Sequence, residues 1–268
     1  MSFTRRQLLA SAAFQAVAPP KPGVTLYVRY TVARAAPAHG ILEGDRIQPL
    51  TAAPFANPKP AGKPIPLNSA KLLYPCQPPK VLAVGLNYKS HIGNRPAPKR
   101  PELFYKPVTC LTHPGDPIVI PKDSKNTHYE GELVIVMGAS NRIFGYTCGN
   151  DVSERDWQNG PHKDLQWWRA KGADTFGPLG PAIAAGLDPK PSKLVTRLNG
   201  ALAQEQFISD LLFDCDAIVA FASRYVTLTP GDVIYTGTPG TTKAMSPGDT
   251  VDVTIDGIGT LRNPVKAG

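Results

Sequence analysis

The sequence feature that most constrains the fold is an apolar run entered by two glutamates. Residues 133–137 are continuously apolar and mostly β-branched, which predicts a buried strand. Residues 143–148 predict a second strand after a short polar connection. Because side chains alternate along a strand, Glu130 and Glu132 should leave the same face, about 7 Å apart at the backbone. Two like charges on such a face resist burial unless another group neutralises them.

A divalent cation would neutralise this pair. Asp151 follows the second predicted strand and can supply a third carboxylate. An all-oxygen set of this kind suits Mg²⁺ or Mn²⁺ better than Zn²⁺. The simpler alternative is that Glu130 and Glu132 are exposed on an edge strand, because Glu-x-Glu alone is a weak signal. The residues by themselves leave both interpretations open.

Five segments, in order along the chain, resemble the fumarylacetoacetate hydrolase family. They include a glycine-led entry motif, the Glu-x-Glu stretch and a late glycine-threonine motif. Ordered matches over about residues 24–266 are more specific than any single motif. The matching segments are residues 85–91, 128–133, 149–158, 171–178 and 230–240.

The resemblance implies a mainly β, α+β fold, a mixed β-sheet roll preceded by a small N-terminal β-domain. We expect residues 20–72 to form this small β-region and a linker, and residues 73–268 to form the catalytic domain. The 29 prolines favour turns and short strands over long helices. The family also implies a homodimer.

Local patterns predict further elements. Asn199-Gly200 marks a hairpin over residues 194–206, and a second hairpin is expected over residues 250–261. Apolar spacing predicts a helix over residues 207–225. The proline-rich segment 92–101 has no apolar pattern, and the resemblance implies a mobile lid over the metal.

Residues 1–19 differ from the rest of the chain. Arg5 and Arg6 precede a short apolar run, which resembles a twin-arginine export signal and would place the protein in the periplasm. Pro19 directly follows a cleavage-like sequence and argues against processing. The alternative is an attached extension, disordered or helical, on a cytoplasmic protein; we favour export. No other stretch approaches the roughly 20 apolar residues of a spanning helix, so no membrane association is expected.

The formal net charge of +8 does not indicate a nucleic-acid partner. Lysine and arginine are scattered, and no basic stretch is interleaved with aromatic residues. A mildly cationic surface suits small anionic molecules, although a general solubility charge explains it equally well. The four cysteines are far apart and without paired spacing, which excludes zinc and redox motifs.

The resemblance assigns roles to particular residues. It implies a metal held by Glu130, Glu132 and Asp151, with His91 as the candidate general base and Lys171 as a second catalytic residue. Lysine at this position would also contact the carboxylate of a small anionic 2-oxo acid. An isolated histidine would more often be a surface residue; its place in the entry motif favours the catalytic role.

Further substrate contacts are expected after the second strand. A short helix beginning at Asp151 would place Arg155 one turn along the same face and Gln158 one turn further. Lys171 is expected in a glycine-flanked loop, and Thr238 in the glycine-rich loop. Arg155 and Lys171 would clamp a substrate carboxylate, with Gln158 and Thr238 completing the substrate-binding set. Taken alone, Arg155 or Lys171 would be interpreted as an ordinary surface charge rather than as a substrate contact.

Lys106 and His128 lie outside this set. Lys106 is a candidate carboxylate contact, but we interpret it as solvated. His128 lies two residues before Glu130 on the same strand face; it is either a partner of a metal ligand, which we favour, or a strand-start residue without a role.

The chain departs from the family pattern at two positions. The hydrolases usually carry a glutamate three residues after the histidine, and here that residue is Asn94. A comparable carboxylate-to-amide change in a serine-protease triad costs about 10⁴ in turnover. Either another carboxylate such as Glu102 serves His91, or the reaction needs no activated water. Val84 replaces a fourth metal-binding aspartate, which is closer to the acylpyruvate hydrolases and the diene-dioate isomerases.

We therefore expect a hydrolase, dependent on Mg²⁺ or Mn²⁺, that cleaves a C–C bond in a 2,4-dioxo acid of the acylpyruvate or fumarylpyruvate type. The metal would stabilise the enolate, and His91 would activate water. One alternative is an isomerase or decarboxylase of a 2-hydroxy-diene-dioate or an oxaloacetate-like acid. Another is a metal- or ligand-binding homologue without catalysis. Asn94 favours these alternatives.

Overall fold

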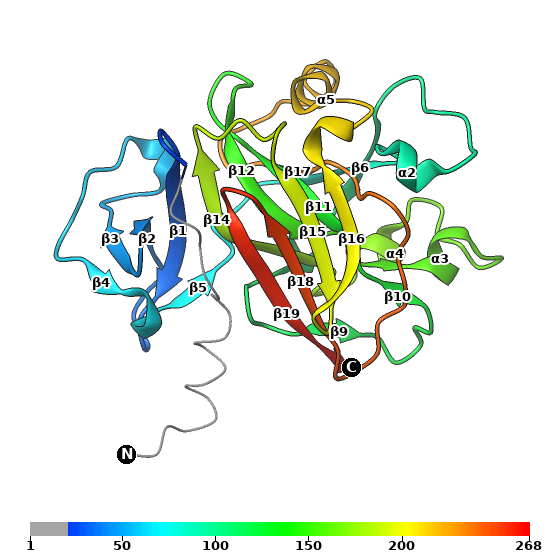
Figure 1. The fold of residues 1–268 in the computed structure, drawn as a ribbon, viewed down its shortest axis with the longest axis horizontal. Helices are drawn as coiled ribbons and strands as arrows, with labels where there is room; N and C mark the ends of the chain where they lie inside the picture. The colour runs from blue at the N-terminus through cyan, green and yellow to red at the C-terminus, as the bar shows by residue number, and fades with distance from the viewer. Residues whose placement is uncertain (1–20) are drawn as a thin grey trace.

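A computed structural model describes residues 21–268 of the chain. The export signal expected in residues 1–19 lies outside the described residues and stays a prediction. Strands dominate the described part, and its α-helices are short (Figure 1). This confirms the mainly β, α+β fold expected from the sequence. No helix within residues 21–268 has the length and apolar character needed to cross a membrane.

Twelve strands form the largest sheet. They are β1 (Thr25–Thr31), β2 (Ala38–Glu43), β3 (Arg46–Pro49), β4 (Ile65–Pro66), β5 (Lys71–Leu73), β6 (Val81–Gly85), β7 (Glu102–Lys106), β8 (Leu111–Thr112), β11 (Gly131–Met137), β12 (Ile143–Asn150), β14 (Gly177–Ala185) and β17 (Val233–Tyr235). The path runs β4-β3-β2-β1-β14-β12-β11-β17-β6-β7, with β5 added on β1 and β8 on β14. The pairs β17–β6 and β14–β8 are parallel among antiparallel neighbours, so the sheet is mixed as expected.

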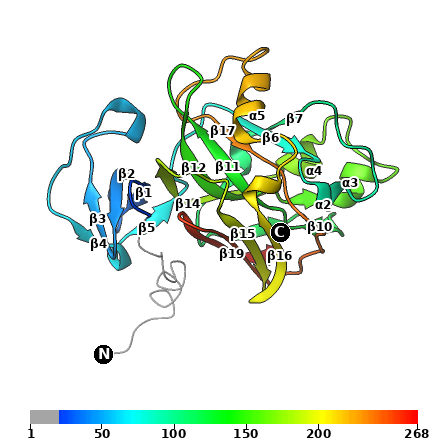
Figure 2. The same cartoon turned by 45° about the horizontal axis from the view of Figure 1, so that its top comes forward.

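A second sheet has five strands in the order β16-β15-β18-β19-β9. These are β9 (Ile118–Ile120), β15 (Lys193–Leu198), β16 (Ala201–Phe207), β18 (Thr250–Ile255) and β19 (Gly259–Ala267), while β10 (Thr127–His128) pairs separately with β13 (Ser153–Glu154). The two predicted hairpins are confirmed as β15–β16 and β18–β19. This sheet packs against β11, β12 and β14 of the first sheet (Figure 2).

The helices cover only small parts of the described chain. They are α2 (Lys89–Ile92), α3 (Arg155–Asn159), α4 (Trp168–Gly172) and α5 (Cys215–Ala222), with 3₁₀ turns at Pro54–Ala56, Leu67–Ser69, Val108–Cys110 and Ile208–Asp210. The helix predicted over residues 207–225 is therefore too long. Asp214 starts α5 late, because its carboxylate accepts a hydrogen bond from Ala217 N and caps the helix there.

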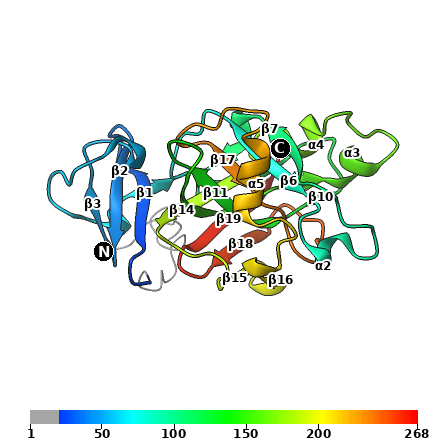
Figure 3. The ribbon, with the colours of Figure 1, turned by 90° about the horizontal axis from the view of Figure 1, so that it is seen from above.

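The N-terminal strands continue the large sheet. They lie beside the rest of the molecule, in blue and cyan (Figures 1 and 3). The junction is the antiparallel pairing of β1 with β14, in which Tyr27 lies opposite Ile183. Backbone hydrogen bonds thus join the N-terminal region to the sheet that carries the site.

The strand predicted from the apolar run, β11, is buried along its whole length. Leu133, Ile135 and Met137 join the core shared with the second sheet, whereas Val134 and Val136 pack into a separate cluster on the opposite face. A strand covered on both faces reads as a continuous apolar run rather than an alternating one. Residues at its start therefore enter the protein interior instead of solvent.

Candidate metal centre and active site

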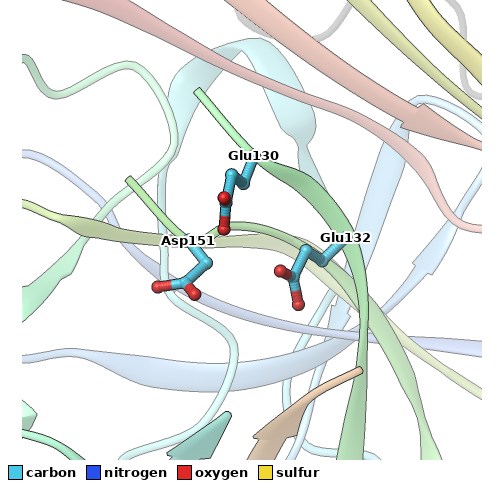
Figure 4. Close-up of side chains that lie close together, drawn as sticks. All are labelled: Glu130, Glu132 and Asp151. Carbon is cyan, nitrogen blue, oxygen red and sulfur yellow. The ribbon is translucent and has the colours of Figure 1, made fainter. Parts of the chain in front are cut away.

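Three carboxylates meet where β11 begins and β12 ends. Glu130 immediately precedes β11, Glu132 lies within it, and Asp151 follows β12, whose last residue pairs with Gly131. Asp151 N donates to Glu130 O at 2.9 Å, which fixes the two strand ends together. Each residue offers an oxygen within 4.8 Å of the others, and the carboxylates are turned toward a common space (Figure 4). The residues of the predicted ligand set thus lie together.

Three cationic side chains surround the carboxylates. Arg155 Nη2 lies 2.5 Å from Glu130, and Lys171 Nζ bonds both Glu130 and Asp151, the latter at 2.8 Å. Lys106 Nζ lies 2.6 Å from Asp151 Oδ1 and also donates to the Lys171 carbonyl. The interpretation of Lys106 as solvated is wrong, because the residue is only 3% exposed. Formally, three negative and three positive groups balance in this cluster.

Local charge shifts the titration of these groups in opposite directions. Burial alone would raise the pKa of Glu130, but Lys171 and Arg155 outweigh it and hold that pKa below its usual value. Burial would lower the pKa of Lys171, but Asp151 and Glu130 raise it, so the ammonium stays charged. Burial raises the pKa of Glu132 well above normal, and the neighbouring charges of Asp151 and Glu130 act in the same direction.

Glu132 shows why a divalent cation fits here. Its Oε2 accepts from Gly237 N at 2.7 Å, but no cationic side chain among residues 21–268 forms an ion pair with it. A buried carboxylate beside two others, without a counter-charge of its own, is stabilised by a shared cation. The donors are all oxygens, which suits either Mg²⁺ or Mn²⁺.

His91 lies on α2 and lines a small cavity beside the three carboxylates. Its Nδ1 is 2.7 Å from the carbonyl oxygen of Gly240. A carbonyl can only accept, so Nδ1 carries the hydrogen and Nε2 keeps a lone pair. Burial lowers the pKa of His91 below 6.5, and Arg155 and Lys171 add to this effect, although Glu130 opposes it. At neutral pH the ring is therefore uncharged and can accept a proton at Nε2.

Asn94 and Glu102, the two residues considered as partners of His91, lie elsewhere. Helix α2 ends at Ile92, and Gly93 follows with φ near +60°, so Asn94 does not share a helical face with His91. Asn94 is exposed and lines a separate surface hollow beside Gln206. Glu102 is exposed and lies 4.0 Å from Arg100. Within residues 21–268, the hydrogen bond of the His91 ring goes to a backbone carbonyl and not to a carboxylate.

Two local expectations about this region are wrong. Asp151 does not begin a helix. Ser153 and Glu154 pair with β10 and form β13, so the helix starts only at Arg155. Lys171 lies on α4 rather than in a loop. Even so, Arg155 reaches the cluster, and its Nη1 donates to Gln158 Oε1 at 2.7 Å.

Thr238 lies at the site, but its hydroxyl is already engaged. Oγ1 donates to Gly131 O at 2.9 Å and accepts from Gln204 Nε2 at 2.9 Å. Donation to a substrate carboxylate would require breaking the first of these bonds. The substrate-binding roles of Arg155, Gln158, Lys171 and Thr238 stay predictions.

His128 is linked to the ligands only indirectly. Its Nδ1 lies 2.8 Å from Thr242 Oγ1 and its Nε2 lies 2.8 Å from Asn126 Oδ1. Thr242 Oγ1 in turn accepts from Arg155, which binds Glu130. His128 therefore supports Arg155 rather than a carboxylate.

A small cavity of about 40 Å³ adjoins the carboxylates. Phe104 and Trp167 form part of its apolar wall, with their ring centres 5.5 Å apart in an edge-to-face arrangement. Phe104 and Trp167 were not identified as site residues from the sequence, and Lys106 was considered only as a candidate carboxylate contact. The available signal was strand alternation in β7, which puts Phe104 and Lys106 on one face. The lining residues are Val84, Gly85, Leu86, His91, Phe104, Glu130, Glu132, Gln158, Trp167, Lys171 and Thr238.

Comparison with known proteins agrees with this arrangement. Residues 80–266 match the family described as Fumarylacetoacetate (FAA) hydrolase C-terminal, and residues 26–75 match Rv2993c-like, N-terminal. Protein Rv2993c of Mycobacterium tuberculosis is 45% identical over 228 residues, covering 79% of this chain and 84% of that protein. Oxaloacetate tautomerase fahd2, mitochondrial, of Xenopus laevis is 39% identical over 210 residues, covering 70% of this chain and 66% of that protein.

A solved structure shares nearly the whole described fold. The X-ray structure of 5-carboxymethyl-2-hydroxymuconate delta-isomerase from Mycobacterium smegmatis superposes with a TM-score of 0.84 and 42% sequence identity, covering 91% of this chain and all of that one. The two family matches, these relatives and the buried acidic triad lead to one conclusion. The chain belongs to the fumarylacetoacetate hydrolase family.

Proposed function

We propose that this protein is a divalent-cation-dependent isomerase that interconverts the keto and enol forms of a short 2-oxo acid of the oxaloacetate class. The observation that carries the proposal is the neutral His91 ring, held by the Gly240 carbonyl instead of a carboxylate. The tautomerase and isomerase names of similar proteins support it over the C–C hydrolase.

Hydrolysis and proton exchange place different demands on His91. To activate water, the base must remove a proton as a nucleophile forms, and a carboxylate beside imidazolium assists this step. In a 2-oxo acid the base instead removes a proton from the carbon next to the keto group, and the resulting charge is delocalised onto the keto oxygen as an enolate. The Gly240 carbonyl orients the ring for such a transfer but provides no full charge, so the local geometry favours proton exchange.

The cluster would hold the cation through Glu130, Glu132 and Asp151. A bound Mg²⁺ or Mn²⁺ supplies Lewis-acid stabilisation of negative charge on the keto oxygen. The Nε2 atom of His91 accepts the proton as the C3–H bond breaks and the electron pair forms the C2–C3 double bond. Returning that proton to the keto oxygen completes the enol, so atoms and charge balance without water. Lys171 stays protonated and keeps positive charge beside the developing anion.

The size of the cavity favours a short acid. Drug-sized ligands occupy pockets of about 300–1,000 Å³, whereas this cavity measures about 40 Å³. Phe104 and Trp167 close one side of it with rigid rings. At this size the cavity holds no 2-oxo acid until the surrounding side chains move, and a four-carbon acid requires less movement than a long diene-dioate.

The decisive assay measures enol absorbance of oxaloacetate with and without Mg²⁺ or Mn²⁺, alongside acylpyruvate hydrolysis. Cation-dependent acceleration of keto–enol exchange, with hydrolysis at least tenfold slower, is expected. Fast acylpyruvate hydrolysis without tautomerase activity would contradict the proposal and support the hydrolase function expected from the sequence. Removal of the cation by a chelator should abolish the exchange, and added Mn²⁺ should restore it.

A further inference from the structure

Gln204 on β16 connects the second sheet with the backbone that carries two candidate ligands. The residue is 4% exposed. Its Oε1 accepts from Gly131 N at 3.2 Å. Its Nε2 donates to Thr238 Oγ1 at 2.9 Å and to Pro239 O at 2.6 Å. A buried amide with partners on both ends is held firmly, because moving it leaves polar groups unpaired.

The same network holds Gly131 from both sides. Its N–H belongs to the peptide shared with Glu130 and donates to Gln204. Its carbonyl belongs to the peptide shared with Glu132 and accepts from Thr238. The two peptide groups on either side of Gly131 separate Glu130 from Glu132. Their orientation therefore depends on Gln204 and on Thr238, which is bonded to Gln204.

Residue 131 must be glycine, because the packing around it leaves no room for a side chain that could hold it in place. A Cβ added at Gly131 would lie 2.0 Å from Thr196 Oγ1 on β15 and 3.3 Å from Val253 on β18. The second sheet thus approaches β11 closely at this residue. Only the backbone groups of Gly131 are available to hold it, and these are the groups that Gln204 and Thr238 bind.

Gln204 also fixes the loop that holds the base. Pro239, which it binds, precedes Gly240, whose carbonyl accepts from His91. Gly237 in the same loop donates to Glu132. The Gln204 side chain therefore fixes the start of β11, which carries the candidate ligands, relative to the loop whose Gly240 carbonyl orients His91.

We propose that Gln204 is a positioning residue that sets the spacing of Glu130 and Glu132 and thereby the affinity for the divalent cation. It needs no contact with substrate for this role. The inference relies on the cation site of the proposed function but not on tautomerase activity.

The test is Gln204→Met, which keeps the size of the side chain and removes its polar ends. Mn²⁺ alone is titrated by calorimetry into the full chain, and an about 10–100-fold loss of affinity is expected, the usual effect of losing a residue that orients ligands. The electron paramagnetic resonance spectrum of bound Mn²⁺ should change shape, because it follows ligand symmetry. Thermal unfolding without Mn²⁺ verifies that the variant is folded.

Thr196→Val is the matched control. Thr196 lies directly opposite Gln204 in the β15–β16 register, is buried and also borders Gly131. Its Oγ1 has no hydrogen-bond partner within the described chain, so the substitution removes no bond. Mn²⁺ affinity should stay within twofold of wild type. Because an unpaired buried hydroxyl is destabilising, the double variant Thr196→Val/Gln204→Met carries the test if the single variant does not fold.

A folded Gln204→Met protein, alone or with Thr196→Val, that binds Mn²⁺ as tightly as wild type would overturn the role of Gln204. An equal loss in the Thr196→Val control would overturn it too, since packing alone would then explain the effect. A wild type that binds no Mn²⁺ would remove the cation site itself and with it the proposed function. These failures give different results and are separable.

Discussion

The two halves of the site are held in different ways. The carboxylate half lies at the joined ends of β11 and β12, and Glu130 and Asp151 each contact two cationic side chains. The base half consists of His91 on a four-residue helix, with its ring bonded to one backbone carbonyl. The first half is fixed redundantly by a buried sheet, whereas the ring in the second half has one hydrogen bond among the described residues.

This difference indicates where such a site can change its reaction. Altering a ligand disturbs a cluster of buried charges, which is costly. Changing what orients the histidine leaves the sheet and its charges intact. On the proposed function, hydrolysis and proton transfer would differ in what orients the histidine, while the cation half stays the same. The following substitutions separate the two halves, beginning with the largest effect.

Glu132→Ala should abolish cation-dependent activity while leaving the fold. Losing the stabilisation that a cation supplies costs several kcal/mol, about a thousandfold in rate. The variant should still fold, because Glu132 forms no ion pair within residues 21–268, although the Gly237 N–H loses its acceptor and stability should fall. Calorimetric titration with Mn²⁺ measures the loss. Unchanged affinity would end the metal-site interpretation, and exposed Glu102→Ala serves as the control.

His91→Gln should lower tautomerase turnover about a hundredfold, the lower end of the range for a lost general base. Mn²⁺ affinity should be unchanged, because His91 contacts none of the three carboxylates through a hydrogen bond or ion pair in the described chain. The comparison variant is His162→Gln, on an exposed loop. If His91→Gln instead weakens Mn²⁺ binding while retaining turnover, the separation of the two halves is wrong.

The kcat/KM should fall about tenfold per pH unit once the pH drops below the pKa of His91, since only the neutral ring accepts a proton. Burial places this pKa below the ordinary 6.5, so the fall should begin below pH 6.5. Activity falls toward low pH because protonation of His91 leaves it unable to accept a proton from the substrate. A profile of kcat/KM under saturating Mg²⁺ measures it. A decline that begins above pH 7 would assign the step to another group.

Asn94→Glu should change both tautomerisation and hydrolysis by less than twofold. The sequence pattern predicts a gain, because a glutamate on the same helical face would support the histidine. The structure lowers that expectation, because α2 ends at Ile92 and Asn94 is exposed in another hollow. A tenfold rise in hydrolysis, about 1.4 kcal/mol in barrier, would show that this segment reaches the site during turnover.

The sequence predicts the carboxylate half better than the rest because that half depends on local rules. The two-residue spacing of Glu130 and Glu132 predicts their common face, and the apolar run after them predicts a buried strand, whereas the residues leave the burial of the two glutamates themselves open. The position of Asp151 follows from an antiparallel neighbour whose end lies beside the start of β11. The hairpin at Asn199-Gly200 is likewise a local signal and is confirmed.

Features that depend on distant partners could not be predicted in this way. Lys106 is buried only because Asp151 and the carbonyls of Lys171 and Phe176 meet its ammonium group. The helix expected at Asp151 is displaced because Thr127 pairs with Glu154. The partner of His91 is a backbone carbonyl, which no residue type signals.

The formal charge balance around the carboxylates has a consequence for ligand selection. Three acidic and three basic side chains cancel, so a bound divalent cation would leave two surplus positive charges in a buried space. A monoanion such as pyruvate would cancel only one of them, whereas a dianion such as oxaloacetate would restore electroneutrality. Uncompensated charge in a low-dielectric interior is strongly unfavourable. If the cation site is occupied as proposed, ligand selection would depend on total charge as well as on shape, and these ion pairs would favour dicarboxylates over monoanions.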